Sequence, residues 1–204
     1  MARPREFDEE AVLDAAMQCF WEQGYEATSV RDLATRMGMT GASLYNAFGD
    51  KRALYRRSLD FYTERSFGER TVRLEASLPP REAIIAFYRE IIELSLGDPK
   101  ARGCMMVNSA LEAGPRDPEF RAVVAEVLGR IQAFFHRCVL AGQRDGSIPL
   151  THDAEDLARF FLSVQLGLRV LARTAPRRDE LEGALRPALA LLGSEDYQEV
   201  ATTQ

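Results

Sequence analysis

The chain of 204 residues is long enough to bury a core as one domain or as two small ones. Hydrophobic residues make up 46% and charged residues 28%, as in ordinary globular proteins, and no apolar run reaches the roughly 18 residues that a membrane span needs. The polar start, MARPREFDEE, argues against a signal peptide, and three cysteines without metal or redox spacing favour a reducing compartment. We therefore expect a cytoplasmic protein with no membrane partner.

The first predicted helix covers residues 8–23. Asp8 can cap it, two glutamates in its first turn suit the positive end of the helix dipole, and Gly24 can end it. Apolar residues recur along this segment at helical spacing and predict a buried stripe, formed by Leu13, Ala16, Met17 and Phe20.

Two short helices joined by a tight turn are predicted between residues 28 and 51. Ser29 and Asp32 have the spacing of a capping box at the start of the first of these helices. Gly38 suits a left-handed turn after it, and Thr40 suits the cap of the second helix. Such a pair is a helix-turn-helix motif, whose second helix enters the major groove of DNA.

The segment GYEATSVRDLATRMGMTGASLYNAFGDKRALY resembles the N-terminal DNA-binding domain of the TetR/AcrR family of transcriptional regulators. The resemblance rests on Phe20, Gly24, Tyr25, Thr28, Ser29, Val30, Ala34, Gly38, Leu44, Tyr45, Phe48, Lys51 and Leu54. It implies a DNA-binding domain over residues 6–66, with its motif at 29–48, and an effector-binding and dimerisation domain over residues 67–204. Asn46 stands where the family more often has His, and it keeps a hydrogen-bond donor at that place.

The residues expected to face DNA lie on the two short helices and at the start of the next one. Hydroxyls and backbone N–H groups at the entrance of the first helix can meet a phosphate. On the second helix two small residues let the backbone approach the groove, and Ser43 and Asn46 can bond to base edges. The resemblance implies that Tyr45 and Lys51 grip phosphates. The predicted DNA contacts are Thr28, Ser29, Arg31, Thr40, Gly41, Ala42, Ser43, Tyr45, Asn46 and Lys51.

The charge of this region differs from that of the whole chain. Six basic and two acidic residues lie between positions 28 and 57, although the net charge of the chain is −5. A local basic face supports DNA binding. The alternative interpretation is that these basic residues simply form a solvated surface. The second helix has no arginine for bidentate contact with guanine, so sequence preference is expected to depend on Arg31, Arg36 or DNA shape.

Helical periodicity continues through the rest of the chain, so the expected fold is all-α. Clusters of proline and glycine separate the apolar segments. The predicted helices cover residues 50–65, 81–96, 104–113, 118–143, 153–175 and 179–192.

A small apolar or amphipathic effector is expected to bind among these later helices. The candidate lining residues, which are of kinds that more often form plain core, are Phe87, Ile91, Cys104, Met105, Asn108, Phe134, Gln165 and Arg169. Cys104 lies near Lys100 and Arg102, whose charges would favour a reactive sensing thiolate, while a small buried hydrophobe is the preferred alternative. Binding would shift the population between states that fit DNA and states that do not.

The segment 153–175 is apolar on nearly every side, which predicts burial by its own domain on one face and by a second subunit on the other. The resemblance implies that the last two helices form a four-helix bundle with their symmetry mates. The predicted dimer contacts are Phe160, Val164, Leu168, Leu171, Leu181, Leu185 and Leu189. The two DNA-binding domains would then meet half-sites roughly 34–36 Å apart, or a multiple of one turn, on a near-palindromic operator.

No sequence pattern supports catalysis. The chain has two histidines, no phosphate-binding glycine loop and no nucleophile elbow, so we expect no enzyme activity, metal or cofactor. The preferred interpretation is a homodimeric transcriptional repressor released from operator DNA by a small molecule. The sequence does not separate a repressor from an activator. The rival from another class is a helical small-molecule-binding protein or enzyme with a vestigial DNA-binding head.

Overall fold

The structure is a computed structural model that describes residues 8–112 and 117–193. Every regular element in those ranges is a helix, which confirms the all-α prediction. No helix in this part of the chain combines the length and hydropathy needed to cross a membrane. By packing, the chain divides into two compact units: the first joins the residues up to Ser66 to Met105–Val124, and the second joins Phe67–Cys104 to the residues from Ala125 onward.

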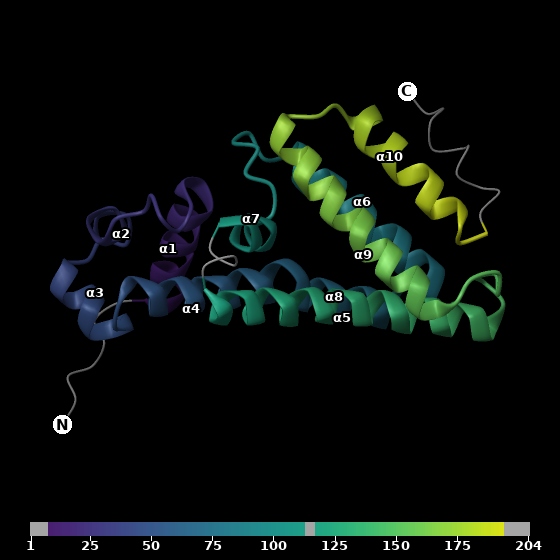
Figure 1. The fold of residues 1–204 in the computed structure, drawn as a ribbon, viewed down its shortest axis with the longest axis horizontal. Coiled ribbons are helices and arrows are strands. Elements are labelled where there is room, and N and C mark those ends of the chain that lie inside the picture. The colour runs from purple at the N-terminus through teal and green to yellow at the C-terminus, as the bar shows by residue number, and fades with distance from the viewer. Residues whose placement is uncertain (1–7, 113–116, 194–204) are drawn as a thin grey trace. The chain divides into compact units, whose positions relative to one another are not determined.

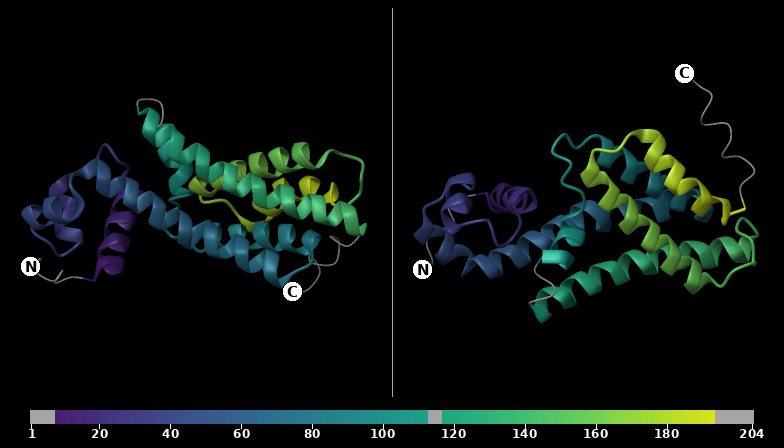
Figure 2. Two further views of the ribbon diagram at one scale, coloured as in Figure 1. Left: turned by 90° about the horizontal axis from the view of Figure 1, so that it is seen from below. Right: turned by 45° about the horizontal axis from the view of Figure 1, so that its top comes forward.

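The first unit begins with α1 (Glu9–Gln23), α2 (Val30–Arg36), α3 (Gly41–Phe48) and α4 (Lys51–Thr63). α1 packs on α2 and α4, α2 packs on α3, and α3 packs on α4, so the first three helices gather around α4 (Figure 1, Figure 2). α7 (Met105–Glu112) also packs on α4 within this unit. The first unit therefore contains α7, which was predicted from the sequence to belong to the effector-binding domain.

Local side-chain caps fix where α2 and α3 begin. The backbone N–H of Asp32 donates to Ser29 Oγ at 3.1 Å, and the Asp32 carboxylate accepts from the Ser29 N–H at 3.0 Å. Thr40 Oγ1 accepts from the Ser43 N–H at 3.1 Å at the start of α3. Gly38 has φ +64° between the two helices, a conformation that favours glycine. These features confirm the predicted capping box, turn and second cap.

The helix that follows the motif extends further than the sequence predicted. α4 passes into a π-helical segment, Glu64–Gly68, and then into α5 (Glu69–Ser77). The predicted end near residue 65 is wrong because Gly68 keeps right-handed helical angles, with φ −58° and ψ −62°. The helix ends only before Pro79, where a proline pair prevents its continuation.

The second unit is built around an aromatic core. α6 (Pro80–Leu96), α9 (Ala154–Leu171) and α10 (Arg178–Ala190) pack on one another, and α5 packs on α6. α8 (Pro118–Asp145) contributes its residues from Ala125 onward, and a 3₁₀ turn (Ala172–Thr174) follows α9. The core rings have centroids 5.1–6.2 Å apart and belong to Phe87, Tyr88, Phe134, Phe135 and Phe161.

The apolar stripe of α10 also faces this core. Leu181, Leu185 and Leu189 are buried within their own subunit, and so is Leu168 of α9. A side chain that its own subunit already covers has no surface left for a partner. We therefore correct the predicted dimer interface by removing these four leucines.

Candidate nucleic-acid interface

α3 has one buried face and one exposed polar face. Leu44 is buried completely and Phe48, one turn later, is buried as well, so Tyr45 and Asn46 between them point outward. Tyr45 is 52% exposed. The other exposed residues of the helix include Ala42, Ser43 and Asn46. Four of the residues predicted to contact DNA thus share one accessible surface.

The side chains of this surface keep hydrogen-bonding capacity. The side chains of Tyr45 and Asn46 have no hydrogen-bond partner in the described part of the chain. The hydroxyl oxygens of Thr40 and Ser43 lie 2.9 Å apart and share one hydrogen bond, which leaves each of them further sites. The face of α3 can therefore both donate to and accept from the edges of bases.

The entrance of α2 is arranged differently from the prediction. Thr28 is 1% exposed, and its hydroxyl donates to the carbonyl of Gly24 at 2.6 Å. The predicted phosphate contact through this hydroxyl is wrong, because the preceding turn uses it internally. Ser29 is exposed, but its hydroxyl donates to Asp32 at 2.5 Å as part of the cap. A phosphate contact by Ser29 stays a prediction.

Most of the basic residues between positions 28 and 57 are paired with acids. Arg52, for example, makes a bidentate contact with Asp117 at 2.9 and 3.0 Å. The pairs involve acids from α1 and from the start of α8: Arg36 with Glu22, Arg52 with Asp117 and Glu119, Arg56 with Glu119, and Arg57 with Glu9. The local positive excess read from the sequence is therefore largely neutralised. Among the described residues, Arg31 and Lys51 have no carboxylate within ion-pair distance.

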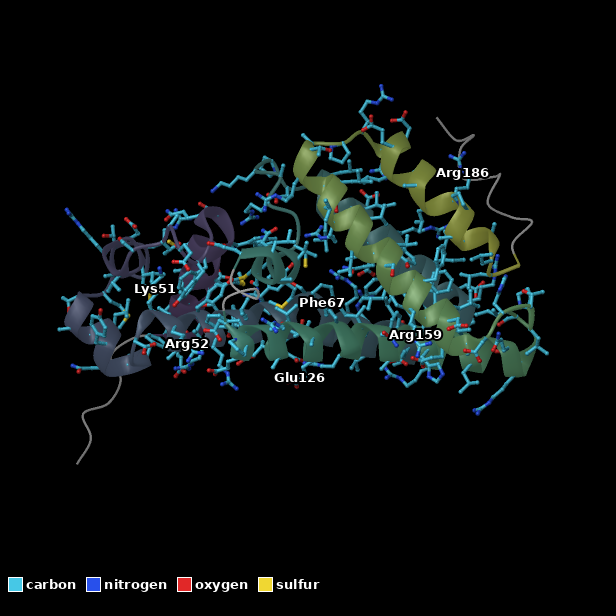
Figure 3. All side chains as sticks on the ribbon, viewed as in Figure 1. Lys51, Arg52, Phe67, Glu126, Arg159 and Arg186 are labelled. Carbon is cyan, nitrogen blue, oxygen red and sulfur yellow. The ribbon has the colours of Figure 1, made fainter. Side chains whose placement is uncertain are left out.

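Lys51 and Arg52 are neighbours at the start of α4 with different surroundings (Figure 3). The Lys51 ammonium donates to the carbonyl of Glu26 at 3.3 Å and lies 4.5 Å from the centroid of the Tyr25 ring. An ammonium has three donors, so two remain for a phosphate. The contacts hold Lys51 beside the loop that leads into α2.

That loop is fixed from α7 by Glu112. Its carboxylate accepts from the backbone N–H of Tyr25 at 3.1 Å and of Glu26 at 2.8 Å. Gly24 has φ +85°, and a Cβ there would lie 2.6 Å from Glu112 Oε2, so this position requires glycine. Sequence reasoning missed Glu112 because no local pattern marks a contact across 86 positions.

A second buried contact joins α4 to α7. The Tyr55 hydroxyl lies 2.6 Å from Ser109 Oγ, and Ser109 in turn donates to the carbonyl of Met105 at 2.7 Å, so Tyr55 is the donor. Burial raises the pKa of Tyr55 to about 12, which keeps the hydroxyl protonated. The Tyr55 ring also stacks edge-on against Phe20 of α1 at 4.8 Å and Phe120 of α8 at 5.1 Å. α7 and the start of α8 thus form one core with the motif helices.

The candidate effector residues fall in both units. Met105 and Asn108 belong to the first unit, and the others to the second: Phe87, Ile91, Cys104, Phe134, Gln165 and Arg169. The rings of Phe87 and Phe134, 5.3 Å apart, are part of the aromatic core. Cys104 is buried, which favours the small-hydrophobe alternative over a sensing thiol. No group of three or more His, Cys, Asp or Glu side chains in the described ranges could hold a metal ion.

Two family models match the chain. "Bacterial regulatory proteins, tetR family" covers residues 12–57, and "Tetracyclin repressor-like, C-terminal domain" covers residues 80–188. YezE of Bacillus subtilis (strain 168), an uncharacterized HTH-type transcriptional regulator, is 32% identical over 94% of this chain and 100% of its own length. ComR of Escherichia coli (strain K12), an HTH-type transcriptional repressor, is 28% identical over 88% of this chain and 86% of its own.

A solved structure is similar over nearly the same range. It is the TetR family regulator CifR, a cysteine mutant in complex with 26-base-pair double-strand operator DNA. The match has a TM-score of 0.82 and 32% sequence identity, and covers 92% of this chain and 98% of that one.

Proposed function

This chain belongs to the TetR family of DNA-binding transcriptional regulators, and from that premise we propose that it is a homodimeric repressor that a small-molecule effector releases from its operator. The observation that carries the proposal is the exposed face of α3. Ser43, Tyr45 and Asn46 lie on this face, while Leu44 and Phe48 are buried on the opposite side of the helix. A short helix with a polar, accessible face after a tight turn is what a major groove admits.

The predicted DNA contacts divide by the part of DNA that they suit. Ser43 and Asn46 would hydrogen-bond to base edges, and Tyr45 and Lys51 would contact phosphates, while Arg31 of α2 would contribute to sequence preference. The sequence of α3, GASLYNAF, has no charged residue. Recognition by α3 itself would therefore depend on hydrogen bonds and on the shape of the duplex rather than on arginine–guanine pairs.

An exposed apolar stripe on α9 supports a dimer. Phe160 is 42% exposed and Leu171 is 41% exposed, and Val164 between them is half-buried. Gly167 lies on the same stripe, and a Cβ at this glycine would meet nothing within 4 Å. Apolar side chains at helical spacing on an accessible face favour contact with a second copy, and a glycine lets two such helices approach closely.

A two-fold dimer would present α3 twice. The operator would then be near-palindromic, with half-sites roughly one helical turn of 34–36 Å apart or a multiple of it. The solved structure of the relative CifR contains a 26-base-pair operator, a length that accommodates two half-sites separated in this way. The repressor assignment is supported by ComR and by DhaR of Mycobacterium sp. (strain GP1), both described as repressors.

The test is selection of genomic duplex fragments by the purified protein, followed by footprinting of the fragments retained. The proposal predicts a protected near-palindrome and a dimer on each site. A reporter gene placed behind the selected operator should be silenced when the protein is supplied, and a screen of metabolites should then restore its expression. Activation of the reporter would contradict the repressor assignment, and retention of no fragment at low salt would contradict the whole proposal.

A further inference from the structure

Two polar side chains of α9 are buried without full compensation. The amide of one lacks hydrogen bonds, and the guanidinium of the other lacks a counter-charge. Gln165 is 0% exposed, and neither its Oε1 nor its Nε2 has a hydrogen-bond partner. Arg169 is 6% exposed; it donates to Ser95 Oγ at 2.8 Å and to the carbonyl of Gly103, and no carboxylate of the described residues pairs with it. A buried amide without hydrogen bonds and a buried guanidinium without a counter-charge both destabilise a fold.

The two side chains share one face of α9, because they are four residues apart. One turn earlier on that face, the carbonyl of Phe161 accepts from the Tyr88 hydroxyl of α6 at 2.6 Å. One turn later on α9, Arg169 donates to Ser95 Oγ of α6. α6 and α9 are thus joined at two levels, and Gln165 lies between them.

The buried residues of α6 between these two levels are apolar. Of the six residues that separate Tyr88 from Ser95, only Ile91 and Ile92 are buried. The Gln165 amide therefore faces a region that offers it no protein partner, and its remaining donors and acceptors suit a ligand.

We propose that Gln165 and Arg169 hold the acidic group of the effector, and that the effector is a small organic carboxylate with an apolar remainder. This inference rests on the proposed function, which requires an effector. A carboxylate accepts up to four hydrogen bonds, so it can take N–H donors from both the guanidinium and the amide. It also supplies the counter-charge that Arg169 lacks, and its apolar remainder matches Ile91 and Phe161.

The same arginine holds the segment that precedes α7. Gly103 has φ +69°, and a Cβ there would lie 2.8 Å from the carbonyl oxygen of Arg169, so this segment runs close against α9. A ligand carboxylate competes with the Gly103 carbonyl for the guanidinium. α7 begins two residues later, at Met105, and it carries Ser109 and Glu112, which support the motif helices. The chain itself therefore links the proposed site to the DNA-binding unit.

The test measures binding to the full-length protein by isothermal titration calorimetry. The probes are hexanoate and benzoate, with hexanamide and benzamide as neutral counterparts of the same shape. The proposal predicts that at least one acid binds and that its amide binds at least about tenfold more weakly. Equal binding of acid and amide would overturn it, and so would the absence of binding by both acids up to about 10 mM.

Variants separate a ligand contact from a structural role. Gln165→Leu removes the unpaired amide, so it is expected to leave the thermal midpoint equal or higher while weakening the acid about tenfold. Arg169→Met is expected to abolish acid binding, and Arg186→Met on α10, an exposed site, to leave it unchanged (Figure 3). Because Arg169 also holds Gly103, its variant risks unfolding, and Gln165→Leu keeps the test decisive. Wild-type acid affinity in Gln165→Leu would overturn the proposal.

Operator affinity is measured separately from ligand binding. If the protein binds its operator and only neutral compounds release it, the acidic class is wrong while the regulatory function stands. If an acid binds through Gln165 and no operator is found, the site stands and the proposed function fails.

Discussion

The carboxylate of Glu112 accepts a hydrogen bond from the backbone N–H of Glu26 at 2.8 Å, across 86 positions of the chain. Its second oxygen accepts from the N–H of Tyr25 at 3.1 Å. The carbonyl of the same Glu26 accepts from Lys51. α7 therefore positions the loop that enters the helix-turn-helix motif and, through that loop, a lysine expected to contact DNA.

Replacing Glu112 by alanine should destabilise this loop. The change leaves two backbone donors without their acceptor, and we expect a loss of about 1–2 kcal/mol, because the site is half-buried and water replaces part of the interaction. Urea unfolding measures the free energy, and amide exchange at Tyr25 and Glu26 should accelerate. Glu126→Ala, at an exposed position of α8, serves as the control (Figure 3). Unchanged exchange at the two amides would contradict the assigned role.

The contact between Tyr55 and Ser109 predicts an asymmetry between two variants. Tyr55→Phe removes the donor, while Ser109 still bonds to Met105, so the expected cost is about 1 kcal/mol. Ser109→Ala leaves the buried Tyr55 hydroxyl without an acceptor and should cost more, up to about 3 kcal/mol. Urea unfolding of both variants measures the difference, with the exposed Tyr45→Phe as a neutral control. Equal costs would show that Tyr55 finds another partner.

The capping box of α2 predicts a pH dependence of stability. Hydrogen bonds from the Ser29 hydroxyl and N–H hold the pKa of Asp32 below its ordinary value. A carboxyl whose pKa is lower in the folded state stabilises the fold above its unfolded pKa of about 3.9, and this contribution disappears as the pH falls through the folded pKa. Asp32→Asn should therefore lower the thermal midpoint at pH 7, and the gap from wild type should close below about pH 4. A gap that does not depend on pH would contradict the assignment.

The apolar stripe of α9 predicts how the dimer is broken. Phe160→Glu and Leu171→Glu should each produce monomers in analytical ultracentrifugation, because a carboxylate would be buried between two copies. Leu150→Glu changes an even more exposed residue outside α9 and should leave the dimer intact. Monomeric wild-type protein, or dimers of both stripe variants, would refute this interface.

Sequence reasoning succeeded where the cause is local. The capping box of Ser29 and Asp32, the turn at Gly38 and the cap at Thr40 depend on residues within a few positions, so their spacing identifies them. The polar face of α3 follows from the inward position of Leu44 and Phe48 at helical spacing.

It failed where distant residues decide the outcome. The charge count of residues 28–57 could not include Asp117 and Glu119, which neutralise Arg52 in the folded chain. The stripe of leucines on α10 has the same period whether a core or a partner covers it, so periodicity could not separate the two. Gln165 and Arg169 were candidates from the sequence, but only burial without partners distinguishes them from core residues.

The most direct test of the central claim, that the exposed face of α3 reads DNA, is a titration of operator affinity against salt. For the wild type, log affinity should fall linearly with log salt, by about 0.9 for each phosphate neutralised. Lys51→Ala should reduce this slope by about one unit, and Asn46→Ala should weaken binding at every salt concentration without changing the slope. A flat salt response, or wild-type affinity in both variants, would contradict the claim.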